Sequence, residues 1–356
     1  MLQWKRTTEI IAGDIIAEKL TQYETGDTIV YFGEVVSPSL KEKLVHHGVE
    51  WILVESKDSQ ESLVKPILSK EVLEEMEKGV KKVFDAVQKE KKIPVDEVST
   101  LSRQVVRSML SNFGDVVVPF FSQMRSFDEY TFCHQVNVSI IAGLIAIEVY
   151  PDEREKAEAI VAGALIHDIG KLIVPKEILN KRTRLTGEEF ELMKKHVEYG
   201  YQMALDSGIE NRIILDEILF HHERFDGSGY IRGLKGNEIP SSARINVIAD
   251  VFDALTSDRV YKMRWSPYQA IGYIIQQAGK AFDPYIVSCF LRLFGIYPVG
   301  TRLLLSNGRE VVVKGNRKNA LTTPIVAYIE QEEELIYLDR QKDIRIDRVL
   351  YEHQED

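Results

Sequence analysis

Apolar residues recur at helical spacing through the middle of the chain. Between residues 69 and 90, Val, Leu, Met and Phe residues repeat every three or four positions with Lys and Glu between them, which is typical of an amphipathic helix. Pro94 interrupts this pattern and is expected to open a second helix, because proline is tolerated in a first turn. Helical patterns continue to about residue 295. We therefore predict a mainly α protein, with an all-helical domain over residues 67–297.

The two ends of the chain show patterns typical of strands. Near the N-terminus, strands are predicted at 27–33 (DTIVYFG) and 49–55 (VEWILVE), with a short helix at about 39–47. After Pro298, Asn307-Gly308 separates two apolar runs, which is a strong hairpin signal, and two further strands are predicted in PIVAYIE and ELIYLD. We predict a small α/β or β module over residues 1–66, with a regulatory or accessory role, and a β segment over 298–356 packed on the helical domain.

Composition and charge exclude several classes of protein. The 356 residues are 44% hydrophobic and 28% charged, as in ordinary soluble proteins. A net charge of −10 with no long basic run disfavours binding to a nucleic-acid polymer or a membrane surface, although a few Lys and Arg can still bind a small anion. The longest apolar runs, 140–147 and 159–166, are far short of the ~20 residues that span a bilayer.

The cellular compartment is expected to be the cytoplasm. Only Cys133 and Cys289 are present, which fits a reducing environment, and the first residues lack the apolar core of a signal peptide.

The candidate chemistry lies in histidines and aspartates of the helical domain. Taken alone, a histidine beside a helix is more often a hydrogen-bonded core or surface residue than a ligand, and an inward aspartate is more often a cap or an ion pair. The pair His167-Asp168 follows an apolar run, however, and a buried carboxylate needs a partner such as a metal ion. Together the pattern predicts a metal site. Its candidate residues are His134, His167, Asp168, His196, His221, His222 and Asp250.

Five segments resemble, in order, the HD-GYP domain of bacterial cyclic di-GMP phosphodiesterases, which belongs to the HD phosphohydrolase superfamily. They are YTFCHQVNVS, ALIHDIGKLIVP, KKHVEYG, HHERFDGSGY and RINVIADVFDALTSDRVYK, between Tyr130 and Lys262. An HD dipeptide alone is weak evidence for the family. HDIGK, then HHE with DGSGY, and then the late Asp250 form a highly specific series.

The resemblance implies a ligand set. One metal would be held by His134, His167, Asp168 and Asp250, and a second by Asp168, His196, His221 and His222, so that Asp168 bridges them. Some members of the family bind a third metal with a Glu four residues before the first ligand His. Tyr130 occupies that position here, and Glu129 is rotated about 100° away on a helix. We therefore expect two divalent ions, with Fe or Mn favoured by the residue types.

Such a centre predicts phosphodiester hydrolysis. Two cations that share a water lower its pKa, and the bridging hydroxide can attack phosphorus in line. Lys171 is placed to reach a phosphate near the metals, and by resemblance Arg259 and Lys262 bind phosphate. By spacing alone, a solvated helix end is the favoured interpretation of Arg259 and Lys262, and only the resemblance favours phosphate binding.

The glycine-rich loop DGSGYIRGLKG departs from the family, because Ile231 stands where a proline is expected after Gly229-Tyr230. Gly227 and Gly229 suggest turns with positive φ, and the loop forms a lip beside the metals. The change to Ile231 is expected to alter loop stiffness, and the Gly227–Ile231 segment is a candidate contact for a signalling protein.

The leading hypothesis is hydrolysis of cyclic di-GMP to pGpG, to GMP, or to both. Two alternatives stay open: an HD phosphohydrolase that acts on another cyclic dinucleotide or nucleotide, and a receptor that binds cyclic di-GMP without hydrolysis. A receptor predicts decayed ligands, and none of the seven is decayed. Whether the chain forms a homodimer, for which the N-terminal module is one candidate, stays open as well.

Overall fold

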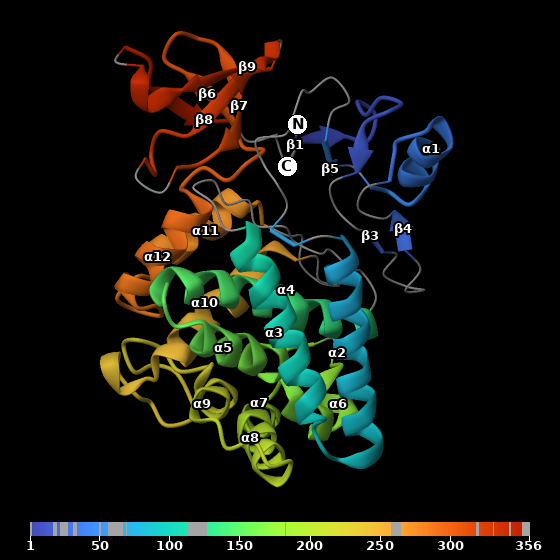
Figure 1. Ribbon diagram of the computed structural model, residues 1–356, viewed down its shortest axis with the longest axis vertical. Coiled ribbons are helices and arrows are strands. Elements are labelled where there is room, and N and C mark those ends of the chain that lie inside the picture. Colours follow the sequence, from blue (N-terminus) through green and yellow to red (C-terminus); the bar gives the residue numbers. More distant parts are fainter. Residues whose placement is uncertain are drawn as a thin grey trace.

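Helices occupy the middle of the chain and strands its two ends, as Figure 1 shows. The computed structural model describes residues 2–16, 20–21, 28–30, 34–49, 51–55, 67–68, 70–112, 127–181, 183–257, 265–317, 320–329, 331–341 and 343–350. The mainly α fold predicted from the periodicity is confirmed.

The helical part begins and ends close to the predicted positions. Pro94 directly precedes the second of its helices, and Phe294 ends the last. The long helices are α2 (Lys70–Glu90), α3 (Val95–Asn112), α4 (Phe127–Val149), α5 (Arg154–Ile166), α8 (His196–Asp206), α9 (Arg212–Phe220), α10 (Ser241–Thr256), α11 (Pro267–Gln276) and α12 (Pro284–Phe294). The shorter ones are α6 (Lys176–Leu179), α7 (Gly187–Lys194), and the 3-10 helices η1 (Ile169–Ile173) and η2 (Gly236–Glu238).

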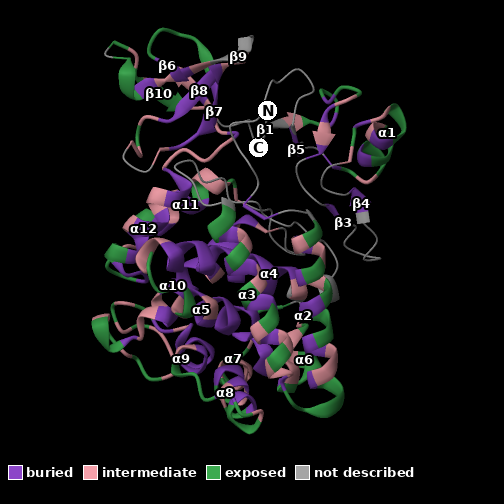
Figure 2. Ribbon diagram, in the orientation of Figure 1, coloured by how far each residue is buried: buried purple, intermediate pink, exposed green. Residues whose placement is uncertain are grey.

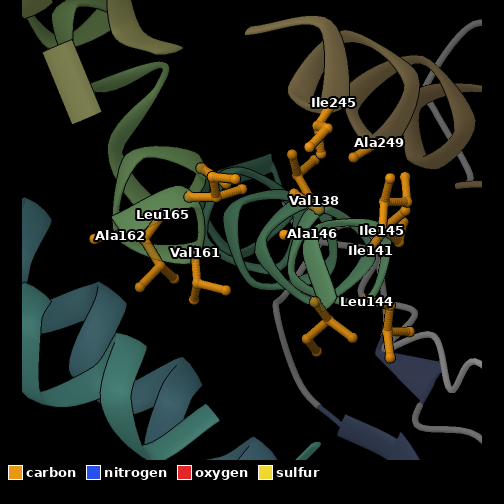
Figure 3. Packing of buried hydrophobic residues seen from close by; sticks show 14 of the residues in the cluster. Val138, Ile141, Leu144, Ile145, Ala146, Val161, Ala162, Leu165, Ile245 and Ala249 are labelled. Atoms are coloured by element: carbon orange, nitrogen blue, oxygen red, sulfur yellow. The ribbon is translucent and has the colours of Figure 1, made fainter. Parts of the chain in front are cut away.

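Helices α4, α5 and α10 form the centre of the core. Their apolar side chains interleave in Figure 3, where Val138 and Ile141 of α4 lie beside α10, and Val161 and Leu165 come from α5. Figure 2 shows the contrast with α2, which buries one side and exposes the other. The second half of α5, Ala159–Ile166, is buried on all sides, so His167, which directly follows the helix, lies deep in the domain.

Helix α4 is longer and more apolar than the run at 140–147 suggested. By length and composition, its residues Phe132–Val149 would suffice to cross a membrane. Within the fold, however, 83% of this window is buried, as expected of a core helix.

The terminal strands confirm the predicted hairpin and most of the predicted strands. The N-terminal strands are β1 (Leu2–Arg6), β2 (Ile15–Ile16), β3 (Leu20–Thr21), β4 (Thr28–Val30) and β5 (Trp51–Glu55), with helix α1 (Pro38–His46). The C-terminal strands are β6 (Arg302–Leu305), β7 (Glu310–Gly315), β8 (Ile325–Tyr328), β9 (Gln331–Tyr337) and β10 (Ile346–Val349), with the 3-10 helix η3 (Leu338–Arg340). These five form one antiparallel sheet in the order β10-β6-β7-β8-β9. Strand β10 was not predicted.

A buried asparagine joins the C-terminal sheet to the last helix. The Asn316 side-chain amide donates hydrogen bonds to the carbonyls of Phe294 and Tyr297, at 3.3 and 2.7 Å. Gly295 allows this approach, because it has a φ of +71° and a Cβ there would lie 2.2 Å from Asn316 Cγ. The contact supports packing of residues 298–356 on the helices, and the domain boundaries themselves remain predictions.

Candidate metal centre

His167 and Asp168 directly follow the apolar helix α5 and lie in the interior of the domain. Residues Ala159–Ile166 are buried, so the helix end lies deep in the domain, where His167 is 0% and Asp168 3% exposed. Asp168 then leaves the helix with φ −96° and ψ 7°, and the chain turns into η1. A carboxylate at this depth is stable only with compensating charge or hydrogen bonds.

Helix α9 packs directly on α5 and brings His221 and His222 to the same point. A Cβ on Gly163 of α5 would lie 1.8 Å from Oε2 of Glu217, so the glycine is required for this approach. Glu217 is fully buried, and burial raises the pKa of its carboxyl well above the usual value, which favours the neutral form. One turn later, His221 Nδ1 lies 3.0 Å from the Glu217 carbonyl.

Three buried imidazoles are oriented in the same way by backbone carbonyls. The Nδ1 atom of His167 lies 2.8 Å from the Ala164 carbonyl, that of His196 2.8 Å from Met193, and that of His221 3.0 Å from Glu217. A carbonyl only accepts hydrogen bonds, so each Nδ1 is the protonated donor and each Nε2 of a neutral ring offers a lone pair.

The Nε2 lone pairs converge on one another. His196 Nε2 and His221 Nε2 are 3.4 Å apart in a buried position. Two facing lone pairs need a proton or a cation between them. Burial lowers the pKa of His221 to about 4, so a proton is disfavoured there at neutral pH. This donor set therefore fits a metal cation.

The predicted residues form two groups whose ligand atoms lie within 4.8 Å of one another. One group holds Asp168, His196, His221 and His222, and the other holds His134, His167 and Asp250. The structure thus brings together all seven side chains, from helices α4, α8 and α10 and from the turns after α5 and α9.

Asp168 lies between the two groups. Its Oδ1 is 3.3 Å from His196 Nε2 and 3.6 Å from His221 Nε2. Its Oδ2 is 3.4 Å from His167 Nε2 and 3.8 Å from His134 Nε2. Each carboxylate oxygen therefore faces one group, which is the geometry needed to bridge two cations.

His134 is held between two carboxylates of α10. Its Nδ1 is 2.7 Å from Asp253 Oδ2, and its Nε2 is 3.2 Å from Asp250 Oδ1. Burial lowers the pKa of His134, but the two carboxylates outweigh it and raise the pKa to about 9. Asp253 also accepts a hydrogen bond from the Asn137 amide at 2.7 Å. The imidazole is thereby fixed with Nε2 directed at the centre, as in a carboxylate–histidine–metal arrangement.

The pKa shifts of His222, Asp168 and Asp250 also favour the binding of a cation. Burial lowers the pKa of His222 well below its usual value, with the neighbouring His221 as a further cause. For Asp168 burial acts to raise the pKa, but Lys171 and His167 hold it well below the usual range. The pKa of Asp250 is lowered as well, because His134 outweighs burial. These shifts favour ionised carboxylates at Asp168 and Asp250 and neutral rings at His221 and His222, whereas the two carboxylates beside His134 favour its protonated form.

Of the three predicted cationic residues, the structure describes Lys171 alone. Its Nζ lies 2.5 Å from Asp168 Oδ2, with the side chain 32% exposed. Arg259 and Lys262 lie outside the described residues. Helix α10 itself ends at Thr256, and Ser257 is extended.

A buried carboxylate holds the glycine-rich loop beside the centre. Glu223 is 1% exposed and accepts hydrogen bonds from the backbone amides of Arg232, Gly233 and Leu234, at 2.6, 3.1 and 3.0 Å. The role of Glu223 in holding the loop was not predicted from the sequence. The available signal was that Glu223 directly follows His221-His222 as a third ionisable residue.

The two glycines of this loop serve different purposes. Gly227 has the positive φ predicted for it, +85°. The same prediction for Gly229 is wrong, because its φ is not positive; instead, a Cβ there would lie 2.3 Å from the Arg224 amide nitrogen. Gly229 is thus required for close backbone approach, and Tyr230 beside it stacks on His222 with ring centroids 4.7 Å apart.

Replacing Asp253 with Asn is expected to weaken metal binding by about 10- to 100-fold, the usual cost of losing a carboxylate behind a ligand histidine. The amide keeps the shape but not the charge that orients His134 Nδ1 at 2.7 Å. Metal titration followed by calorimetry measures the change. As a control, Asp206→Asn removes an exposed carboxylate of α8 and should leave the affinity unchanged. Equal affinities for the Asp253 variant and the original chain would show that Asp253 does not position His134.

Comparison with known proteins gives consistent matches. Residues 110–286 match the HD domain family. A cyclic di-GMP phosphodiesterase of Pseudomonas aeruginosa is 38% identical over 232 residues, which cover 65% of this chain and 53% of that protein. A cyclic di-GMP phosphodiesterase response regulator of Xanthomonas campestris is 44% identical over 158 residues, 44% of this chain and 41% of that protein. A 3′3′-cGAMP-specific phosphodiesterase of Vibrio cholerae is 32% identical over 213 residues, 55% of this chain and 41% of that protein. The chain thus spans about half the length of these relatives or less.

Proposed function

Residues 110–286 of this chain belong to the HD domain family, and from this premise we propose that the chain is a metal-dependent phosphodiesterase that hydrolyses cyclic di-GMP to pGpG, to GMP, or to both. The observation that carries the proposal is the position of Asp168, whose two oxygens face two separate groups of imidazoles. The names of the relatives from Pseudomonas and Xanthomonas support this substrate.

The side chains have distinct roles in this proposal. Two divalent cations, when bound, would supply Lewis acidity that activates water and neutralises phosphate charge. Asp168 would bridge the two groups and hold them at a fixed separation, and the Nδ1 hydrogen bonds keep the His167, His196 and His221 rings in place. Lys171, whose partly exposed side chain contacts Asp168, would pair with a nonbridging phosphate oxygen.

The donor set favours Fe or Mn as the two divalent ions. Five imidazoles and two carboxylates suit transition metals, whereas Mg²⁺ and Ca²⁺ prefer oxygen ligands alone. We assign His134, His167 and Asp250 to one ion and His196, His221 and His222 to the other, with Asp168 shared. Arg259 and Lys262 remain proposed phosphate-binding residues.

Hydrolysis of a different cyclic dinucleotide is the second candidate. The Vibrio relative named for 3′3′-cGAMP favours it, and that substrate differs from cyclic di-GMP in one base while sharing the phosphodiester ring. The two ligand groups would hold cations that contact the phosphates and not the bases, so the same centre would serve both substrates. A receptor without activity is disfavoured, since all seven ligand side chains are present and gathered.

Restoring proline at Ile231 is expected to change kcat/KM by less than about tenfold, or ~1.4 kcal/mol of barrier. The neighbouring amides hold this turn: Tyr230 donates to the His222 carbonyl at 3.2 Å and Arg232 donates to Glu223 at 2.6 Å. Ile231 itself contributes partly buried apolar packing. Steady-state kinetics on the Ile231→Pro variant, with Ile231→Val as the control for packing, measure the effect. A larger change would show that the loop controls the chemistry.

We propose no specific partner beyond the substrate. The segment Gly227–Ile231 remains a candidate contact for a signalling protein, because Ser228 within it is exposed. A homodimer remains a proposal as well. The cytoplasm remains the proposed compartment, and the burial of Cys133 and Cys289 as thiols and not as a disulfide is consistent with it.

One coupled measurement tests the proposed function. Protein purified without oxygen is analysed for metal, and the same preparation is incubated with cyclic di-GMP and with 3′3′-cGAMP before chromatography of the products. About two Fe or Mn per chain, with linear products from cyclic di-GMP that disappear after chelation, are the expected result. Turnover of 3′3′-cGAMP alone would establish the second candidate. Turnover that survives complete metal removal would refute the metal-dependent mechanism.

A further inference from the structure

The ring of Phe190 lies at the outer end of a row of aromatic side chains that begins at the metal centre. Tyr230 stacks on His222 with ring centroids 4.7 Å apart, and Phe190 meets Tyr230 edge to face at 6.3 Å. His222 belongs to one of the two ligand groups, whereas the Phe190 side chain is 47% exposed. The row therefore leads from the buried centre to an aromatic surface in contact with solvent.

A lysine lies beside this aromatic surface. Lys194 Nζ is 5.4 Å from the centroid of the Phe190 ring and 5.8 Å from that of Tyr230. It also pairs with Glu191 at 2.6 Å, and its side chain is 20% exposed. The rings of Phe190 and Tyr230 thus share one cation, which retains donors for an acceptor on a bound molecule.

The helix that carries Phe190 and Lys194 is fixed next to the centre. Thr186 and Glu189 form a capping box at the start of α7, and Lys181 pairs with Glu189 at 2.5 Å. At the other end, Lys194 precedes the ligand candidate His196 by two residues. Phe190 is therefore presented to solvent from a rigid element and at a defined place relative to the centre.

We propose that a purine base stacks on Phe190 while the phosphate of the same nucleotide lies at the metal centre. Lys194 donates hydrogen bonds to acceptor atoms of that base. The inference rests on the proposed function, since it assumes a nucleotide substrate. A nucleotide carries its base one sugar away from its phosphate, so a base-binding surface must lie a short way from the metals and outside the ligand sphere. Phe190 occupies such a place, separated from His222 by one ring.

The chemistry of the surface matches a purine. Stacking of a base on an aromatic side chain is worth about 1–3 kcal/mol, and the guanine O6 and N7 atoms accept hydrogen bonds from a lysine. Single exposed apolar residues are ordinary on protein surfaces. Phe190 differs because it continues a series of rings from a metal-ligand candidate and carries a cation at its side.

Calorimetric titration of the metal-loaded full chain with GMP and with inorganic phosphate tests the inference without requiring turnover. Phe190→Ala is expected to raise the Kd for GMP by about tenfold, corresponding to ~1.4 kcal/mol of lost stacking. The Kd for phosphate should change less than about twofold, because Phe190 contacts no metal-ligand candidate directly. Phe190→Trp should restore GMP binding, since it returns a stacking face.

Tyr285 provides the matched control. It is an exposed aromatic side chain, 58% exposed on α12, and Tyr285→Ala should leave both dissociation constants unchanged. Equal weakening of GMP and phosphate by Phe190→Ala would show that the ring only supports the metal centre, and this result would overturn the inference. Unchanged GMP binding in that variant, or no GMP binding by the original chain, would overturn it as well.

Lys194→Met tests the second half of the inference and separates it from the proposed function. The variant should lower the preference for GMP over AMP by about fivefold, because adenine replaces the O6 acceptor by an amino group. An unchanged preference would refute the role of Lys194. Phe190-dependent GMP binding by a chain that does not hydrolyse cyclic di-GMP would leave the base site standing and refute the proposed function instead.

Discussion

Replacing Asp168 with Ala is expected to lower kcat for cyclic di-GMP by at least about a thousandfold, or ~4 kcal/mol of barrier, and to reduce bound metal from about two ions per chain to one or fewer. The carboxylate faces both imidazole groups, with Oδ1 3.3 Å from His196 Nε2 and Oδ2 3.4 Å from His167 Nε2. Its loss also leaves Lys171 without its partner at 2.5 Å. Metal analysis and product chromatography on the same preparation measure both effects.

Two further variants make the result for Asp168 interpretable. Asp206→Ala removes an exposed carboxylate of α8 and should keep full metal content and turnover. Asp168→Asn keeps the shape but lacks one anionic oxygen, so it should lose metal as well. An Asp168→Ala chain that retained two ions would contradict the bridging role, whatever its turnover.

The seven candidate ligands named from the sequence lie together in the structure, and their binding of metal remains a proposal. His167-Asp168 after an apolar run and the adjacent His221-His222 are unusual combinations, and the resemblance to the HD-GYP domain implied the full set. Which nitrogen of each ring faces the centre was not predictable. That choice depends on carbonyls of the preceding helical turn, such as Ala164 for His167, and these become acceptors only once the helix ends there.

The supporting carboxylates were missed because their surroundings come from distant segments. Asp253 lies one turn after Asp250 in α10, and helical spacing alone does not say which of the two faces the metals and which holds His134 from behind. In the sequence alone, Glu223 resembles a charged surface residue. Its buried position depends on the backbone amides of residues 232–234, which donate hydrogen bonds to it.

Strands of the C-terminal sheet were predicted where a turn signal bounds them. Asn307-Gly308 marks the β6–β7 hairpin, with Gly308 at a φ of +78°. Strand β10 pairs with β6 across a long sequence separation and an irregular register, and two adjacent charged residues separate its Ile346 from its Val349, so the alternation typical of a strand is missing. Its place at the sheet edge depends on that pairing, which local sequence does not reveal.

Replacing Gly170 with Ala is expected to lower kcat by at least about a hundredfold and to destabilise the chain by about 1–3 kcal/mol, the usual cost of overpacking. Gly170 follows Asp168 in η1, and η1 lies directly against α8. A Cβ on Gly170 would lie 2.0 Å from the carbonyl oxygen of His196 and 2.5 Å from the amide nitrogen of Gly200. Both are backbone atoms that cannot rotate away, so η1 and α8 must separate, and Asp168 must move away from His196.

The separation should be visible in metal content as well as in turnover, since Asp168 Oδ1 and His196 Nε2 are 3.3 Å apart and belong to the same ligand group. Metal analysis and urea unfolding of Gly170→Ala measure the two effects. Gly272→Ala is the matched control, because that glycine lies inside helix α11 and a Cβ there meets nothing within 4 Å. The control should be neutral or slightly more stable, as alanine is the better helix former. Full metal content and turnover in the Gly170 variant would show that the centre does not depend on the close contact between η1 and α8.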